Sequence, residues 1–181
     1  MLMAFHIFRD PQLLARVRET LSDHFSNCPA MDIDPSKLEK EPLLSSLYAE
    51  TLRLYVKTYF VVSSPHHDVD LGRWWLPKGR IGLMNAGISQ MDGSYWNTQG
   101  DAHPVESFWA DRFLVDPADP NSGPINPAFR DSDLVHPEKA AADGKPYFSM
   151  DGLEGAWFPY GGKISDRPPP RAIASSPSDS G

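Results

Sequence analysis

The segment "PLLSSLYAETLRLY", residues 42–55, constrains the fold most, because a helix over it turns charged side chains toward its apolar face. That face follows steps of three and four residues: Leu43, Leu47, Glu50 and Leu54. Arg53 lies three residues after Glu50, beside the same face. Two interpretations stay open at this point. An exposed pair would stabilise the helix by about 0.2–0.5 kcal/mol. A buried pair would need further polar partners to offset its desolvation.

The chain before this helix also predicts helical structure. Asp10 is a good N-cap and Pro11 suits a first helical position, so we expect a helix from there to the turn-forming "SNCPAMD". The opening "MLMAFHIF" is interpreted as the tail of a helix whose beginning is missing.

The chain after the helix changes character. "TYFVV" is β-branched and aromatic and predicts a strand. "VDLGRWWLPKGRIGLMNAG" predicts two strands around "LPKG", with Pro77 at the second and Gly79 at the fourth turn position. From Gly93 to about Pro159 we expect mostly irregular chain, with short helical possibilities near "ESFWADRF". We interpret the five tryptophans as packing anchors.

Composition bounds the class of protein. With 181 residues, 40% of them hydrophobic and 23% charged, the chain is typical of one globular domain. A net charge of −7 argues against nucleic-acid binding. The single Cys28 excludes an intramolecular disulfide and a multi-cysteine zinc site. No apolar run reaches the ~20 residues of a membrane span. Residues 163–181 are rich in proline and serine, which predicts a disordered tail.

The order of these motifs resembles the C-terminal half of cytochrome P450 haem-thiolate monooxygenases. The resemblance rests on a proline-started helix, the E-x-x-R helix, a strand and hairpin with "LPKG", then "FWADRF" and "WFPYGG". It is strongest to the fungal and mammalian members grouped with sterol hydroxylases, and it covers about residues 2–162. It implies a mixed α/β fold, mainly helical in the parent, with a small β-sheet and a long irregular meander.

The resemblance implies roles for particular residues. Glu50 would pair with Arg53 and Arg112 in one buried network that holds the haem-binding core together, as a scaffold and not as a proton donor. Phe158, Tyr160, Gly161 and Gly162 would cradle the haem edge. The stretch after the helix would border a substrate pocket, although a core strand is an equal alternative. The pocket candidates are Thr58, Phe60, Val62 and Ser63.

The sequence departs from that family after Gly162. The family places a cysteine, the thiolate ligand of the haem iron, four residues after the last glycine of its loop. Here Lys163 replaces that glycine and Arg167 stands at the cysteine position. Arginine stays protonated and cannot ligate a metal, so no metal ligand is assigned. We therefore expect a chain truncated within the haem-binding loop, whose oxygen-activating helix would precede Met1.

Two functions follow as expectations. The family implies a haem-dependent monooxygenase with a lipophilic or sterol-like substrate and an NADPH-dependent reductase as partner, of which this chain would be a fragment inactive on its own. The alternative is a non-catalytic remnant or interaction fragment with its Pro-rich tail. Family members typically face the cytoplasm from the endoplasmic-reticulum membrane. This chain shows no anchor, so its location stays open, with the cytoplasm as one alternative.

Overall fold

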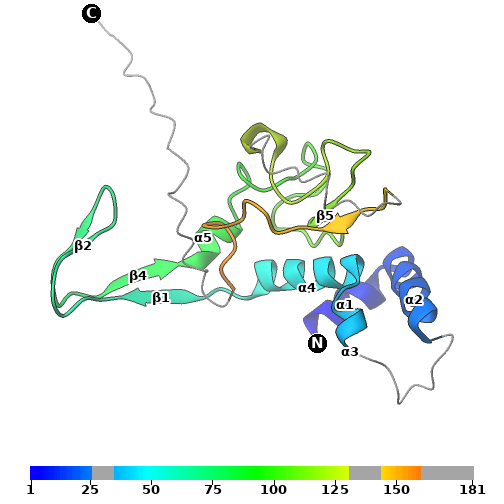
Figure 1. Ribbon diagram of the computed structural model, residues 1–181, viewed down its shortest axis with the longest axis horizontal. Coiled ribbons are helices and arrows are strands. Elements are labelled where there is room, and N and C mark those ends of the chain that lie inside the picture. The colour runs from blue at the N-terminus through cyan, green and yellow to red at the C-terminus, as the bar shows by residue number, and fades with distance from the viewer. Residues whose placement is uncertain (26–34, 131–143, 160–181) are drawn as a thin grey trace, which may run out of the picture.

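The computed structural model describes residues 1–25, 35–130 and 144–159, which form helices around α4 and three small antiparallel sheets (Figure 1). The expected mixed fold class is confirmed. The helices are α1 (Leu2–Arg9), α2 (Pro11–Phe25), α3 (Pro35–Leu38), α4 (Pro42–Tyr55) and α5 (Ala86–Gln90), with a 3-10 turn η1 (Pro127–Phe129). The strands are β1 (Tyr59–Val62), β2 (Val69–Asp70), β3 (Trp75–Leu76), β4 (Gly82–Asn85), β5 (Leu114–Val115) and β6 (Tyr147–Phe148).

The N-terminal helices pack against α4 as a helical corner. Asp10 separates α1 from α2, and its carboxylate accepts hydrogen bonds from the amides of Gln12 at 2.9 Å and Leu13 at 3.1 Å. The predicted start of α2 is therefore confirmed. The apolar sides of the three helices meet, together with Ala110 of the irregular segment, in one buried cluster that also holds Ile7, Leu13, Val17, Leu43 and Leu47.

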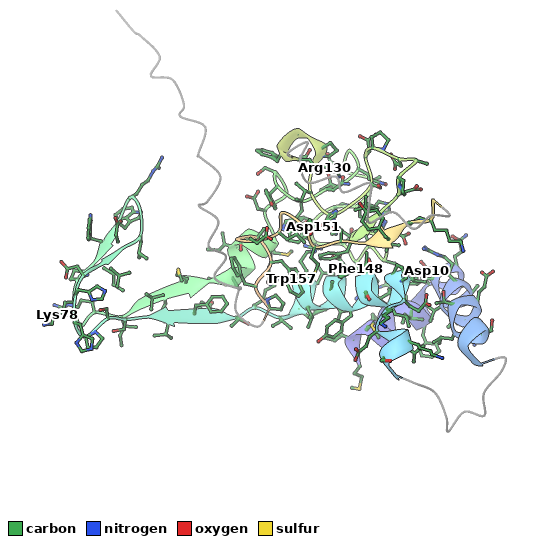
Figure 2. All side chains as sticks on the ribbon, viewed as in Figure 1. Asp10, Lys78, Arg130, Phe148, Asp151 and Trp157 are labelled. Carbon is green, nitrogen blue, oxygen red and sulfur yellow. The ribbon has the colours of Figure 1, made fainter. Side chains whose placement is uncertain are left out.

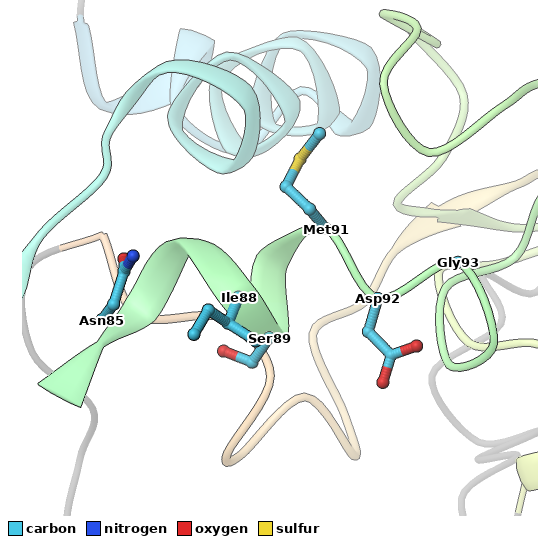
Figure 3. A pocket seen from close by; sticks show the side chains of 6 residues that line it. All are labelled: Asn85, Ile88, Ser89, Met91, Asp92 and Gly93. Atoms are coloured by element: carbon cyan, nitrogen blue, oxygen red, sulfur yellow. The ribbon is translucent and has the colours of Figure 1, made fainter.

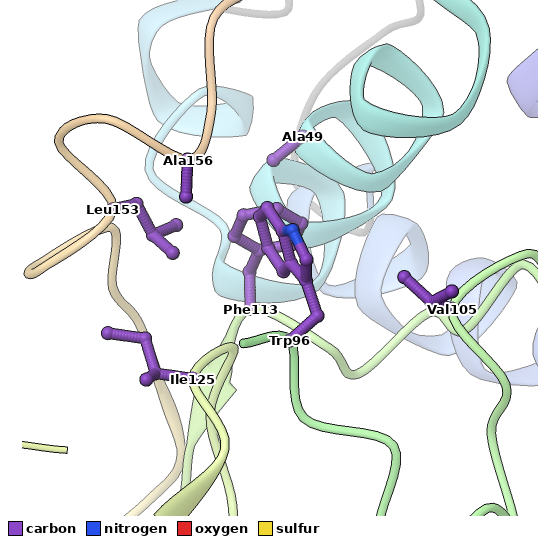
Figure 4. Packing of buried hydrophobic residues seen from close by; sticks show 7 residues of the cluster. All are labelled: Ala49, Trp96, Val105, Phe113, Ile125, Leu153 and Ala156. Atoms are coloured by element: carbon purple, nitrogen blue, oxygen red, sulfur yellow. The ribbon is translucent and has the colours of Figure 1, made fainter. Parts of the chain in front are cut away.

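A second core lies on another side of α4 (Figure 4). Its centre is the edge-to-face pair of Trp96 and Phe113, whose ring centroids are 5.7 Å apart. Both side chains are fully buried. Around them lie smaller buried residues from four separate stretches of chain: Ala49, Val105, Ile125, Leu153 and Ala156. Because α4 contributes to both cores, it is the central element of the molecule.

The strands after α4 form an arm that projects away from the helices, with Lys78 near its far end (Figures 1 and 2). β1 pairs antiparallel with β4, and Val61 lies opposite Leu83. β2 pairs with β3, and Asp70 lies opposite Trp75. β1 matches the predicted strand "TYFVV".

Two strands flank "LPKG" as predicted, β3 and β4, but they do not pair with each other in the hairpin that the resemblance implied. β3 turns back onto β2, while β4 crosses to β1, so the two strands flanking the turn have different partners. The turn itself also begins one residue later than expected. The amide of Arg80 donates to the carbonyl of Pro77 at 3.0 Å, which makes Pro77 the first turn residue and Gly79 the third. Gly79 has φ 72°, a conformation that favours glycine.

The described chain after Gly93 is mostly irregular, and the helix considered near "ESFWADRF" does not form. Successive turns replace it, in which the amides of Ser107 and Arg112 bond carbonyls three residues back. Trp74 and Trp75 are 74% and 65% exposed, so the interpretation of all five tryptophans as packing anchors was wrong for these two. Among the described residues, no helix has the length and apolarity needed to cross a bilayer.

Candidate functional site: a buried carboxylate between two guanidiniums

The inward-facing side of α4 carries Glu50, whose carboxylate is fully buried. Its Oε2 accepts a hydrogen bond from Nε of Arg53 at 2.7 Å, and its Oε1 accepts one from Nη2 of the same residue at 2.8 Å. Oε1 also accepts from Nε of Arg112 at 3.0 Å and from the amide of Trp109 at 3.2 Å. The structure therefore brings together the three residues that the sequence analysis grouped.

Arg53 connects α4 to two segments far along the chain. Its Nη1 donates to the carbonyl of Gln90 at the end of α5, at 2.9 Å, and its Nη2 donates to the carbonyl of Val105 at 2.7 Å. The guanidinium carbon lies 5.2 Å from the centre of a Trp96 ring, in a cation–π arrangement. A bidentate carboxylate, two carbonyls and an aromatic face thus surround this fully buried cation.

Arg112 connects Glu50 to the irregular segment through hydrogen bonds to backbone carbonyls. Its Nη1 donates to the carbonyl of Asn97, and its guanidinium carbon lies 5.2 Å from a Trp109 ring centre. Its Nη2 approaches three further carbonyls, those of His103, Pro104 and Ser107, at 3.5, 3.2 and 3.3 Å. One side chain therefore donates to backbone carbonyls at several points of this loop and holds them together.

The electrostatics of the site are those of one carboxylate shared by two guanidiniums. Burial lowers the pKa of Arg112, the nearby Glu50 charge opposes that shift, and the second cation, Arg53, adds to it. The remaining positive charge is met by the oxygen ends of carbonyl dipoles. Because each donor and acceptor of this network is occupied by protein, the network is suited to holding chain segments together and not to transferring a proton.

Two residues of the site were missed by the sequence analysis. Ser46, one turn before Glu50 on α4, is fully buried, and its hydroxyl donates to the carbonyl of Ala110 at 2.6 Å and accepts from the amide of Phe113 at 3.2 Å. Gln90 is also fully buried, and neither polar atom of its side chain has a partner within the described residues. Ser46 could have been found from its position four residues before Glu50, on the same face of α4. No feature of the sequence pointed to Gln90.

The residues expected at the haem edge are only partly described. Phe158 is half-buried, and its ring meets that of Phe60 edge-on at 5.9 Å between centroids. Tyr160, Gly161 and Gly162 lie outside the described residues, as do Cys28 and Arg167.

None of the four pocket candidates lines the hollow that the described residues form beside α5. Thr58 donates its hydroxyl to the carbonyl of Pro159 at 2.9 Å, Val62 is half-buried on β1, and Ser63 is exposed. That hollow is shallow and open, with a volume of about 680 Å³ (Figure 3). It is lined by other residues: Asn85, Ile88, Ser89, Met91, Asp92 and Gly93. In the described part of the chain, no three side chains of the metal-binding types gather into a site.

Comparison with known proteins places this sequence in a family. The chain is 41% identical over 162 residues to cytochrome P450 monooxygenase efuG of Hormonema carpetanum, a match that covers 84% of this chain and 28% of that protein. It is 36% identical over 159 residues to cytochrome P450 monooxygenase fsoE of Humicola fuscoatra, covering 84% and 26%. For cytochrome P450 monooxygenase calL of Penicillium decumbens, the identity is 30% over 159 residues, covering 86% and 24%.

The chain thus spans about a quarter of the length of these relatives. No protein-family model matches it, and no solved structure does. Three relatives that share most of this chain carry the same family name, at 30% to 41% identity. Over the region that it shares with them, the chain belongs to the cytochrome P450 family.

Proposed function

We propose that this chain supplies the scaffold beneath the haem pocket of a cytochrome P450, with α4 as the family's E-x-x-R helix and the irregular segment after α5 as its meander. The observation that carries the proposal is the burial of Glu50 between Arg53 and Arg112. Bidentate arginine–carboxylate pairs fix geometry as well as charge. The network would hold α4, α5 and the irregular segment in one arrangement, from which the chain at Phe158 leads toward the haem edge.

The donor chemistry of the chain does not fit a thiolate-ligated haem. The position at which the family carries its cysteine is Arg167 in this sequence, and a guanidinium is not a metal ligand. The single cysteine, Cys28, comes before α3 and α4 in the sequence. The loop that would supply the ligand comes after the E-x-x-R helix. We therefore propose that this chain alone does not carry out monooxygenation, and that its contribution is structural.

For a whole protein of this kind, the family name of the relatives supports a monooxygenase. That protein would bind haem, take electrons from an NADPH-dependent reductase and insert one atom of molecular oxygen into a lipophilic or sterol-like substrate. The stretch from Thr58 to Ser63 would lie toward the substrate, and residues 158–162 toward the haem edge. Haem would supply the oxidising chemistry.

A second candidate is an interaction fragment without catalysis, and the exposed apolar side chains of the molecule favour it. Phe5 and Phe8 on α1, and Val61 and Leu83 on the arm, are between 57% and 70% exposed. Apolar faces of this kind are typical of surfaces that pack against another structure. The two candidates share the scaffold and differ in whether haem is bound to it.

A carbon-monoxide difference spectrum of the reduced, haem-supplemented chain tests the proposal. We expect no Soret band of the thiolate type, because the ligand position holds arginine. A thiolate-type band would overturn the proposal, and the Cys28→Ser variant is the matched control, since it removes the one side chain that could produce that band. Haem binding with an imidazole-type band would be compatible with the scaffold role and would exclude the second candidate.

A further inference from the structure

The last described residues of the chain are fastened to the segment that follows α4. The hydroxyl of Thr58 donates to the carbonyl of Pro159 at 2.9 Å, a contact between residues 101 positions apart. Thr58 lies between the end of α4 and the start of β1, and Pro159 is buried. A buried carbonyl requires a donor, and the Thr58 hydroxyl provides one.

Two further contacts hold the residues immediately before Pro159. The ring of Phe158 meets Phe60 on β1 edge-on, at 5.9 Å and 71°. The indole nitrogen of Trp157 donates to the carbonyl of Ala49 on α4 at 3.3 Å, and Figure 2 shows Trp157 over that helix. Three consecutive residues are thus attached to α4 and the chain directly after it. We call this set of contacts the 157–159 latch.

The latch and the buried charge network share one helix. Ala49, which accepts from the Trp157 indole, precedes Glu50 directly in α4. A rigid helix that holds Glu50 and Arg53 on one side therefore also sets the position of residues 157–159. The arrangement fixes residues 157–159 relative to the network through α4, in addition to the packing of Leu153 and Ala156 against the irregular segment.

The orientation of the Thr58 hydroxyl separates this residue from the other pocket candidates. Its hydrogen points to a backbone carbonyl of the same chain, and the hollow beside α5 is lined by none of the latch residues. We infer that Thr58 is a positioning residue, which fixes the point at which the chain leaves Pro159. The inference rests on the proposed function in one respect, the assignment of the chain after Pro159 to the haem edge.

Chymotrypsin cleavage of the Trp157–Phe158 bond in the 181-residue chain tests the latch without haem. Cleavage requires this segment to leave α4 and β1, so its rate reports the open population when opening is fast. Thr58→Val removes the hydroxyl at nearly constant volume, and we expect cleavage about fivefold faster, the effect of losing one ordinary hydrogen bond. Thr58→Ser keeps the donor and is expected to cleave at the rate of the unaltered chain.

Thr51→Val is the matched control, because the Thr51 hydroxyl donates at 2.7 Å to the carbonyl of Leu47 within α4, which is not part of the latch. It should leave cleavage at this bond unchanged. Any of three outcomes would overturn the inference. Thr58→Val could be cleaved at the rate of the unaltered chain, both valine variants could be cleaved equally faster, or Thr58→Ser could fail to restore the original rate. Because the assay contains no haem, failure of haem binding would affect the proposed function and leave this result standing.

Discussion

At the scale of single residues, the other charges of the core depend on Glu50. One carboxylate faces two guanidiniums, and the backbone carbonyls around Arg53 and Arg112 supply only partial negative charge. Removing the carboxylate would leave two buried cations facing each other. Breaking a buried ion pair from one side is costly because the desolvation of the remaining charge is no longer compensated.

Glu50→Gln should therefore destabilise the chain strongly. It preserves the shape of the side chain but removes its charge and turns an amide donor toward other donors. We expect the free energy of unfolding, measured in urea, to fall by about 3–5 kcal/mol. The matched control is Asp111→Asn, which breaks the bidentate pair with Arg16 on the surface and should cost under about 1 kcal/mol. Equal losses from both variants would contradict the role given to Glu50.

His103 should make stability depend on pH. Its ring stacks on Trp109 at 4.4 Å, and its pKa is lowered first by burial and then by the Arg112 charge, with Asp111 opposing. The folded state therefore binds the proton less readily than the unfolded state. The contribution of His103 to the free energy of unfolding is fully present above the ordinary histidine pKa of 6.5. It is lost as the pH drops from there toward the lowered pKa of His103 in the folded state.

The measurement is urea unfolding at a series of pH values between about 7.5 and 5. Compared with the unaltered chain, His103→Gln should lose less stability over that interval, because glutamine does not titrate. His6→Gln is a useful companion, since the pKa of His6 is also lowered, first by burial and then by Arg9, while Glu50 opposes. Parallel pH profiles for the chain and His103→Gln would show that the histidine contributes nothing.

At the scale of elements, the start of α2 depends on a single cap. Asp10 accepts two amide hydrogen bonds at the junction with α1. Asp10→Ala should lower the free energy of unfolding by about 1 kcal/mol, whereas Asp10→Asn, which also caps well, should change it little. Circular dichroism during urea unfolding measures both. If alanine and asparagine behave alike, the cap does not stabilise the helix.

Elements that depend on neighbouring residues were predictable from the sequence, and those that depend on distant partners were not. The Asp10–Pro11 pair contains enough information to start α2. The turn at Pro77 was recognisable too, but nothing in it says that β4 pairs with β1 across 20 residues while β3 pairs with β2. Likewise, spacing left Glu50 and Arg53 open between an exposed and a buried pair. The third partner, Arg112, decides between the exposed and the buried pair, and it lies 62 residues after Glu50 in the sequence.

At the scale of the whole molecule, the core is concentrated around α4, and no element of the described residues covers the apolar face of the arm. Val61 and Leu83 lie opposite each other on one face of the β1–β4 pair, and they are 65% and 69% exposed. An isolated two-stranded sheet is marginal in water, and both of its edges can accept another strand. Among residues 1–25, 35–130 and 144–159, the arm therefore combines an apolar face with edges that no further strand joins, a combination that favours association.

We expect the purified chain to self-associate through this arm. The double variant Val61→Lys with Leu83→Lys places two charges on the apolar face and should shift light-scattering mass toward that of the monomer. The control is Gln12→Lys with Ser63→Lys, two exposed polar positions that change the net charge equally. This control separates the loss of apolar surface from a general charge effect. Two outcomes would contradict this expectation: an equal reduction of the mass by both double variants, or an unaltered chain that is monomeric and unfolds cooperatively. Either outcome would mean that the arm does not need a partner. The interaction-fragment candidate would then lose its support.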